Sequence, residues 1–164
     1  MRLVVACALA AVAAGCAEHQ RLAEDTLEGK PWESQKALVP PYPKEANLLP
    51  FYVGPPRLFA YFVDSASVSV GPDGIVRYTL VARSPSGADN VSYEGIRCQT
   101  YETRTYAFGG LDRTWVQARN QQWTSYSRYQ NDQHLVLADD FFCTVRGTKT
   151  AEEAVRALAR GKPR

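Results

Sequence analysis

The chain has little of what most catalytic and nucleic-acid-binding sites require. It has two histidines, His19 and His134, which leaves few choices for a hydrolase that needs a base beside its nucleophile. Its 19 basic residues form no dense block, unlike those of a nucleic-acid-binding protein. A glycine-rich phosphate loop is also missing, since Gly109-Gly110 is typical of a hairpin turn. We therefore expect no nucleic-acid partner and no nucleotide cofactor.

Metal ligands are equally scarce. No spacing of histidine, cysteine and carboxylate residues matches a tetrahedral site, so we expect no metal and no cofactor. On a helix, His134 would lie about one and a half turns from Asp139, which is a poor geometry for a catalytic pair. We predict instead that His134 is an exposed residue on a helix face.

The N-terminal segment has the pattern of an export signal. Arg2 precedes an unbroken run of apolar and small residues from 3 to 14, and Gly15 and Cys16 follow. A charged start, an apolar core of about a dozen residues and small residues before the cleavage site are typical of secretory signals. The run is too short to span a bilayer, and no second long apolar stretch follows it. Residues 1–15 are therefore predicted to be a signal peptide.

Cys16 is the predicted lipid-attachment site. Residues 13–16 read Ala-Ala-Gly-Cys, which fits the bacterial lipoprotein pattern except that leucine is usual three positions before the cysteine. Ordinary cleavage after Ala17, giving a soluble periplasmic protein, is the alternative. Because Ala17 rather than aspartate follows the cysteine, resemblance to bacterial lipoproteins implies an outer-membrane lipoprotein that faces the periplasm.

The other cysteines agree with an exported protein. Cys7 lies within the signal, and acylation of Cys16 would leave Cys98 and Cys143, an even number in an oxidising compartment. We predict that Cys98 and Cys143 form a disulfide, which would close a loop of about 45 residues.

The chain is predicted to have one globular domain, residues 37–164. Roughly 150 residues remain after the signal, enough for one core but not comfortably for two. Residues 16–36 are polar and charged, as in a flexible tether between the lipid anchor and the domain. Trp32 is the exception and is expected to dock on the domain. Residues 40–53 are rich in proline and apolar residues, which predicts an extended strap across the core.

The fold class is predicted to be α+β, with an antiparallel sheet in meander order. From Leu58 the apolar residues recur with a period of two, and turn residues separate the runs. The predicted strands are 58–63, 67–70, 75–83, 90–98, 104–108 and 114–119. In 75–83, Tyr78 and its alternate neighbours share one face and Arg77 lies on the other, which predicts a sheet covered on one side and solvated on the other.

Two helical segments are expected after the sheet. Residues 132–143 are predicted to form a short helix, which the disulfide would fasten to the sheet. Thr150 and Glu153 have the spacing of a capping box, so a terminal helix is predicted to start there and to end at Gly161.

Several short runs, spread over about residues 32–143, carry a family resemblance. The most specific run is Tyr-Glu-Gly-Ile-Arg-Cys at 93–98. The other runs are 41–43, 62–67, 73–74, 76–80, 83–88, 90–92, 106–109, Trp115, 118–120 and Trp123. In these runs the chain resembles the cryptic neisserial protein family of small betaproteobacterial envelope proteins. The resemblance implies an exported, single-domain protein. Because the family has no assigned activity, it implies no catalytic residue.

Glu94 is the candidate buried carboxylate. It shares a strand face with Cys98, and a disulfide-bonded cysteine is usually buried, so Glu94 is expected to point inward and to need a partner. Arg77, Arg83, Arg97 and Arg104 are the candidates, and we predict an ion pair of Glu94 with Arg77. The alternative is a catalytic carboxylate that cleaves glycans together with a second one.

An aromatic cluster is the candidate binding patch. Aromatic and polar residues gather in a short region, namely Trp115, Arg119, Trp123, Tyr126 and Tyr129. Such a mixture suits sugar stacking or a protein interface, and the favoured alternative is that the rings cap an open sheet edge.

Together these features predict a non-enzymatic envelope protein. It would contact the membrane through its lipid anchor and act by binding or assembly with an envelope protein or a glycan. A cell-wall protein that binds or cleaves glycans, using the aromatic cluster and Glu94, is the alternative.

Overall fold

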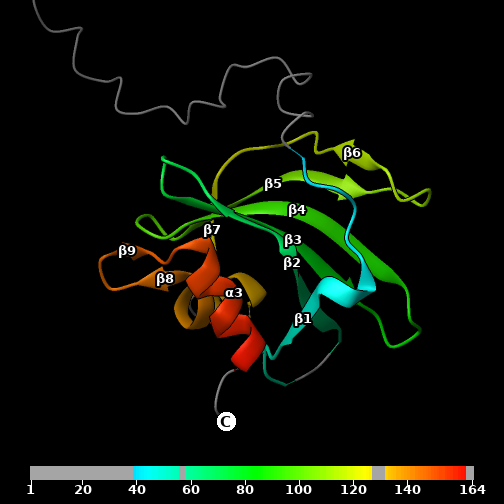
Figure 1. Cartoon of the computed structure of the whole chain (residues 1–164). Coiled ribbons are helices and arrows are strands. Elements are labelled where there is room, and N and C mark those ends of the chain that lie inside the picture. Colours follow the sequence, from blue (N-terminus) through cyan, green and yellow to red (C-terminus); the bar gives the residue numbers. More distant parts are fainter. Residues whose placement is uncertain (1–38, 56–57, 127–131, 162–164) are drawn as a thin grey trace, which may run out of the picture. The chain divides into compact units, whose positions relative to one another are not determined.

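A meander of antiparallel strands forms the body of the protein, and helices pack on one of its faces (Figure 1). The computed structural model describes residues 39–55, 58–126 and 132–161, all within one unit, Pro31–Arg164. The main sheet has the order β1-β2-β3-β4-β5-β6, and β7 also pairs with β5. Its strands are β1 (Leu48–Phe51), β2 (Ala60–Val70), β3 (Ile75–Arg83), β4 (Asp89–Arg97), β5 (Glu102–Gly109), β6 (Trp115–Gln117) and β7 (Thr124–Ser125).

The predicted α+β meander is therefore confirmed. The predictions for the signal peptide 1–15, Cys16, the tether 16–36 with Trp32, and Tyr129 lie outside the described residues.

One predicted break in the sheet is instead an irregularity within a strand. The predicted strands 58–63 and 67–70 are both parts of β2, whose register with β3 shifts between Asp64 and Ser69. The Ser67 hydroxyl donates to the Asp64 carbonyl at 2.7 Å and accepts from the Thr79 amide at 2.8 Å. The side chain thus replaces a ladder bond that the extra residues would otherwise leave open.

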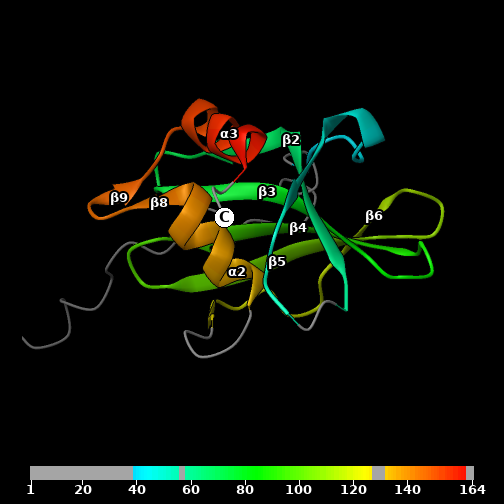
Figure 2. The same cartoon turned by 90° about the horizontal axis from the view of Figure 1, so that it is seen from below.

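The helical layer follows the sheet in sequence. It consists of α2 (Gln133–Val136), the π-helical η2 (Leu137–Phe142) that continues it, and α3 (Ala151–Arg160), with the short hairpin β8 (Cys143–Thr144) and β9 (Gly147–Thr148) between them (Figure 2). The predicted capping box of Thr150 and Glu153 is confirmed. Gly161 ends α3 with a φ of 67°, a conformation that favours glycine.

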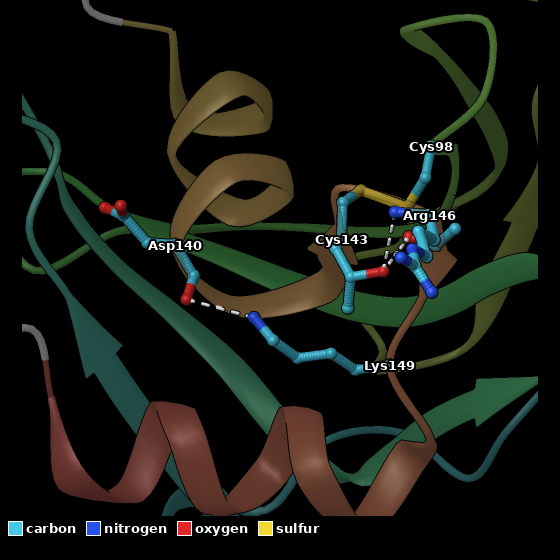
Figure 3. Close-up of a disulfide and its surroundings, with 7 residues drawn as sticks. Cys98, Asp140, Cys143, Arg146 and Lys149 are labelled. Atoms are coloured by element: carbon cyan, nitrogen blue, oxygen red, sulfur yellow. Dashed lines mark hydrogen bonds between the residues drawn. A yellow bond between two sulfur atoms is a disulfide. The ribbon is translucent and has the colours of Figure 1, made fainter.

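The main core lies between the helices and the face of the sheet that we call the inner face. Tyr78 and Val76 of β3 and Ile96 of β4 are fully buried there against Leu137 and Phe142 of η2. The same face includes Cys98, whose predicted disulfide with Cys143 is confirmed (Figure 3). The bond joins the end of β4 to the end of η2.

The opposite, outer face of the sheet is not simply solvated, which corrects the prediction. Thr79 and Val81 of β3 are no more than 1% exposed, and Tyr93 of β4 is 6% exposed. A second cluster lies on this face, in which Tyr93 and Tyr106 pack with Trp115.

The predicted strap crosses this outer face. The 3-10 turn η1 (Glu45–Asn47) interrupts it, and it continues into the edge strand β1. Trp115 Nε1 donates to the Pro40 carbonyl at 2.8 Å, near β6. At the other end, the Ser65 hydroxyl of β2 donates to the Asn47 carbonyl at 3.0 Å. The strap therefore covers polar and aromatic residues that would otherwise face water.

Candidate functional site

A buried polar network on the inner face is the strongest candidate site. Alternation along β4 places Ser92, Glu94 and Ile96 on this face, and Tyr78 is the register partner of Glu94 on β3. Glu94 is 5% exposed, so its carboxylate lies in the core and requires partners.

The helical layer supplies a histidine to this network. Asp132 is the N-cap residue of α2, and its carboxylate accepts from the His134 amide at 2.8 Å. The cap starts the helix so that residue 134 lies in its first turn. The His134 side chain is 16% exposed and extends to the carboxylate of Glu94.

Five side chains are linked by short hydrogen bonds. His134 Nε2 lies 2.9 Å from Glu94 Oε2, and His134 Nδ1 lies 3.0 Å from Asp132 Oδ1. The Tyr78 hydroxyl donates to Glu94 Oε2 at 2.9 Å, and the Ser92 hydroxyl donates to Glu94 Oε1 at 2.6 Å. Both oxygens of Glu94 are therefore satisfied by side chains from three different elements.

The electrostatics favour a charged pair. Burial acts to lower the pKa of His134, but hydrogen bonds to Asp132 and Glu94 outweigh it and raise this pKa to about 10. Burial acts to raise the pKa of Glu94, but the bonds from His134, Ser92 and Tyr78 hold it below the ordinary value. The pKa of Tyr78 is raised by burial and then by the neighbouring Glu94 charge. Near neutral pH the His134 imidazolium therefore faces the Glu94 carboxylate, and the Tyr78 phenol is neutral.

This arrangement suits a structural ion pair. Each ring nitrogen of His134 faces a carboxylate, so the imidazolium donates in both directions and keeps no lone pair for a general base. The Ser92 hydroxyl donates to Glu94 rather than to the histidine, so it is not activated as a nucleophile. The network joins the start of α2 to the centre of the sheet.

Two sequence predictions about these residues are wrong. His134 is not on an exposed helix face, because its ring is held between two carboxylates. Arg77 is not the partner of Glu94, because it neighbours Tyr78 along β3 and lies on the outer face. Its guanidinium forms an ion pair with Asp73 at 2.6 Å.

Sequence reasoning also missed Tyr78, Ser92 and Asp132 as members of the network. The period of β4 pointed Glu94 inward, and an aspartate two residues before a histidine at a helix start was a usable signal for the cap. The pairing of Glu94 with His134 spans 40 residues and had no signal in the sequence.

The predicted aromatic patch does not form one surface. Trp115 lies on the outer face, where its ring centroid is 5.4 Å from that of Tyr42 and 6.2 Å from that of Tyr93. Tyr126, 5% exposed, belongs to the inner core and meets Tyr101 edge-on. The sheet therefore separates two residues that the sequence had grouped.

The remaining described members of that patch differ in their surroundings. Trp123 is stacked beneath the Arg97 guanidinium at 4.1 Å, and Arg104 lies 5.5 Å from the same ring. Arg119 is exposed and directly follows the buried Ala118. The rings of Trp115 and Trp123 are thus covered by neighbours, as expected of rings that cap a sheet.

Over residues 39–55, 58–126 and 132–161, no group of three or more histidine, cysteine or acidic side chains is placed to hold a metal ion. Within the same ranges, no helix has the length and hydropathy needed to cross a bilayer.

The fold and the site define a two-layer α+β domain whose helical layer is fixed to one antiparallel sheet by a disulfide and a buried ion pair. The chain belongs to the CNP1-like family, whose profile matches residues 27–159 and which has no characterised function. A curated relative, Cryptic neisserial protein 1 of Neisseria gonorrhoeae (strain ATCC 700825 / FA 1090), is 32% identical over 72 residues, which cover 37% of this chain and 36% of the relative. No solved structure matches the chain.

Proposed function

We propose that this protein is an exported, lipid-anchored component of the cell envelope that acts without catalysis, by binding a partner protein. The signal pattern of residues 1–15 and the position of Cys16 support export and anchoring. The Cys98 to Cys143 disulfide supports an oxidising compartment. In this proposal the acyl chains on Cys16 hold the protein at the outer membrane, and the domain faces the periplasm.

The hairpin of β5 and β6 carries the proposal of binding. Phe108 and Val116 are cross-strand partners and are 52% and 56% exposed, and Leu111 in the connecting turn is fully exposed. These three are among only seven large apolar residues that are exposed in the part of the chain the structure describes. Exposed apolar side chains concentrated on one hairpin are typical of a protein interaction surface.

The buried network supports a non-catalytic role. Its histidine is protonated and bonded on both sides, and the pKa of Glu94 is lowered, whereas the acid of a glycosidase needs a raised pKa. Glu94 is therefore better suited to fixing the helical layer than to cleaving a glycan.

Binding of a glycan remains the second candidate, and the geometry favours it less. Sugar recognition uses ring faces that are open to the ligand. The rings of Trp115 and Trp123 already contact Tyr42, Tyr93 and Arg97, and Tyr126 is buried. The apolar hairpin offers a more accessible surface.

Site-specific crosslinking in living cells tests the proposed function. A photoreactive amino acid replaces Leu111 in the full-length chain, and Val145 is the matched control, since it is as exposed and also lies in a hairpin turn. We expect a discrete protein adduct from position 111 and none from position 145. The adduct should be lost when Cys16→Ala removes the anchor. Identical adducts from both positions, or none from position 111, would contradict the proposal.

A further inference from the structure

One edge of β6 pairs with β5, and we call the opposite edge the outer edge of β6. The kind of partner can be inferred from this outer edge, and the inference rests on the proposed function. β6 is the last strand in the sheet order, and within the described ranges no strand pairs with its other side (Figure 1). An open strand edge presents amide and carbonyl groups that can pair with another chain.

The register shows which backbone groups face outward. The Gly110 amide donates to the Thr114 carbonyl at 2.7 Å, and the Ala118 amide donates to the Tyr106 carbonyl at 3.0 Å. In an antiparallel ladder such bonded pairs recur at every second residue, so Val116 bonds to Phe108 across the hairpin. The amides and carbonyls of the two flanking residues, Trp115 and Gln117, therefore point away from β5.

The side chains beside this edge would give an added strand an apolar centre. Val116 projects on the inner side, next to the exposed Phe108. Trp115 and Gln117 project on the outer side. A partner strand would thus place apolar residues against Val116 and bury surface that is exposed in the protein alone.

The positive charge beside the outer edge of β6 favours an acidic partner. Arg113 and Arg119 lie three residues to either side of Val116 and are both exposed. Arg113 donates to the Pro43 carbonyl at 3.2 Å, and across the described ranges neither guanidinium forms an ion pair with a carboxylate. The carboxylate of Asp112 is engaged by the Thr114 hydroxyl at 2.7 Å.

A second copy of this chain fits this edge poorly. Pairing that uses Trp115 and Gln117 of both copies would centre on Val116 and place Arg113 opposite Arg119 twice. Like charges directly opposite each other destabilise a strand pair. A partner strand with carboxylates opposite Arg113 and Arg119 would instead complement both arginines.

We propose that the outer edge of β6 binds an extended segment of a partner protein as an added antiparallel strand, and that this segment is apolar at its centre and acidic at both ends. Main-chain hydrogen bonds to Trp115 and Gln117 give affinity, and Val116, Arg113 and Arg119 give register and specificity.

The probe for the test is a short synthetic peptide with alternating valine and threonine, flanked by two glutamates at each end. A matched peptide has lysines in place of the glutamates. Fluorescence anisotropy with the detergent-solubilised full mature chain should show about tenfold tighter binding of the glutamate peptide. Equal binding of the two peptides, or no binding of either, would overturn the proposal.

Two variants at one position isolate the backbone contribution. Gln117→Pro removes the outward amide without breaking a bond to β5, since proline is tolerated on edge strands. Gln117→Ala keeps the amide. We expect Gln117→Pro to weaken peptide binding about tenfold and Gln117→Ala to leave it nearly unchanged, with the thermal midpoint of each variant as the check on folding. If both variants bind the peptide equally well, the proposal of an added strand is wrong.

Hydrogen exchange identifies other occupants. The amides of Trp115 and Gln117 should exchange rapidly in the protein alone and slowly with the peptide bound. Protection in the protein alone would overturn the proposal. If that protection depended on protein concentration, a second copy of the chain would occupy the edge. If it did not, the chain's own N-terminal residues would occupy the edge.

The in-cell crosslink separates this inference from the proposed function. If the Leu111 adduct persists at full yield in a Gln117→Pro background, a partner binds the hairpin without adding a strand, and only the strand inference fails. If Leu111 gives no adduct at all, the proposed function itself fails.

Discussion

Glu94 lies within β4 and Cys98 directly follows the end of that strand, four residues later, and the two residues hold opposite ends of one helical segment. Glu94 pairs with His134 at the start of α2, and Cys98 is bonded to Cys143, which directly follows η2. The segment between these two links contributes Leu137 and Phe142 to the core. One strand thus fixes both the position and the direction of the helical layer.

Loss of the histidine should destabilise the domain. His134→Ala leaves the buried Glu94 carboxylate without its positive partner, which costs about 3 kcal/mol of unfolding free energy. Asp139→Ala is the control, since residue 139 is exposed on the same helical segment and its loss should cost less than about 0.5 kcal/mol. Urea unfolding of both variants measures the difference. Equal losses would show that the ion pair contributes nothing particular.

The same pair predicts how stability depends on pH. The pKa of His134 is raised from 6.5 to about 10 in the folded protein, so its contribution is complete below the unfolded pKa and is lost as the pH rises toward 10. The pKa of Glu94 is lowered, so its contribution is present above its ordinary value and is lost as the pH falls through the folded pKa. In a His19→Gln background, the ring NMR signals of His134 should stay constant between about pH 6 and pH 8. Titration near 6.5 in the folded state would refute the charged pair.

Removal of the disulfide should loosen the other end of the segment. The bond closes a loop between residues 45 apart in sequence, and its loss costs about 4 kcal/mol in the chain-entropy model. The double variant Cys98→Ser and Cys143→Ser should unfold at lower urea, and the amides of residues 137–142 should lose protection from hydrogen exchange. Unchanged protection in that range would show that packing alone holds η2.

Gly95 should not accept a side chain. An added Cβ would lie 2.9 Å from the Tyr106 hydroxyl and 3.1 Å from a methyl carbon of Ile75. The guanidiniums of Arg77 and Arg104 also lie over the Tyr106 ring, 5.7 and 5.6 Å from its centroid, and Tyr106 is 5% exposed, so the ring has little room to move. Gly95→Ala should therefore cost about 1 to 3 kcal/mol. Thermal unfolding measures this cost, and a second variant, Tyr106→Leu, should relieve part of it.

Several elements could be predicted from the sequence because their causes are local. A period of two defines β3 and β4, and the capping box of Thr150 and Glu153 defines the start of α3. The disulfide followed from counting cysteines after the signal was removed. Each of these signals lies within a few residues or depends only on composition.

Other features depended on contacts between distant segments. The break predicted near Asp64 became an irregularity in one strand, because the Ser67 hydroxyl replaces a ladder bond across to β3. The residues of the predicted aromatic patch lie on two faces of the sheet. Trp115 of β6 packs on the outer face, and the chain after β6 brings Tyr126 into the inner core. Residue spacing alone does not say on which side of a sheet a returning segment packs.

Glu94 shows which features the sequence determined and which features only the tertiary structure decided. The sequence by itself determined the strands, the terminal helix, the disulfide and the inward direction of this carboxylate, because alternation and local capping depend on neighbouring residues. Only the tertiary structure decided that its partner is His134 rather than Arg77, and that the outer edge of β6 is open within the described chain. A buried charge takes whichever partner the packing brings within hydrogen-bond distance, and that partner came from a helix 40 residues away.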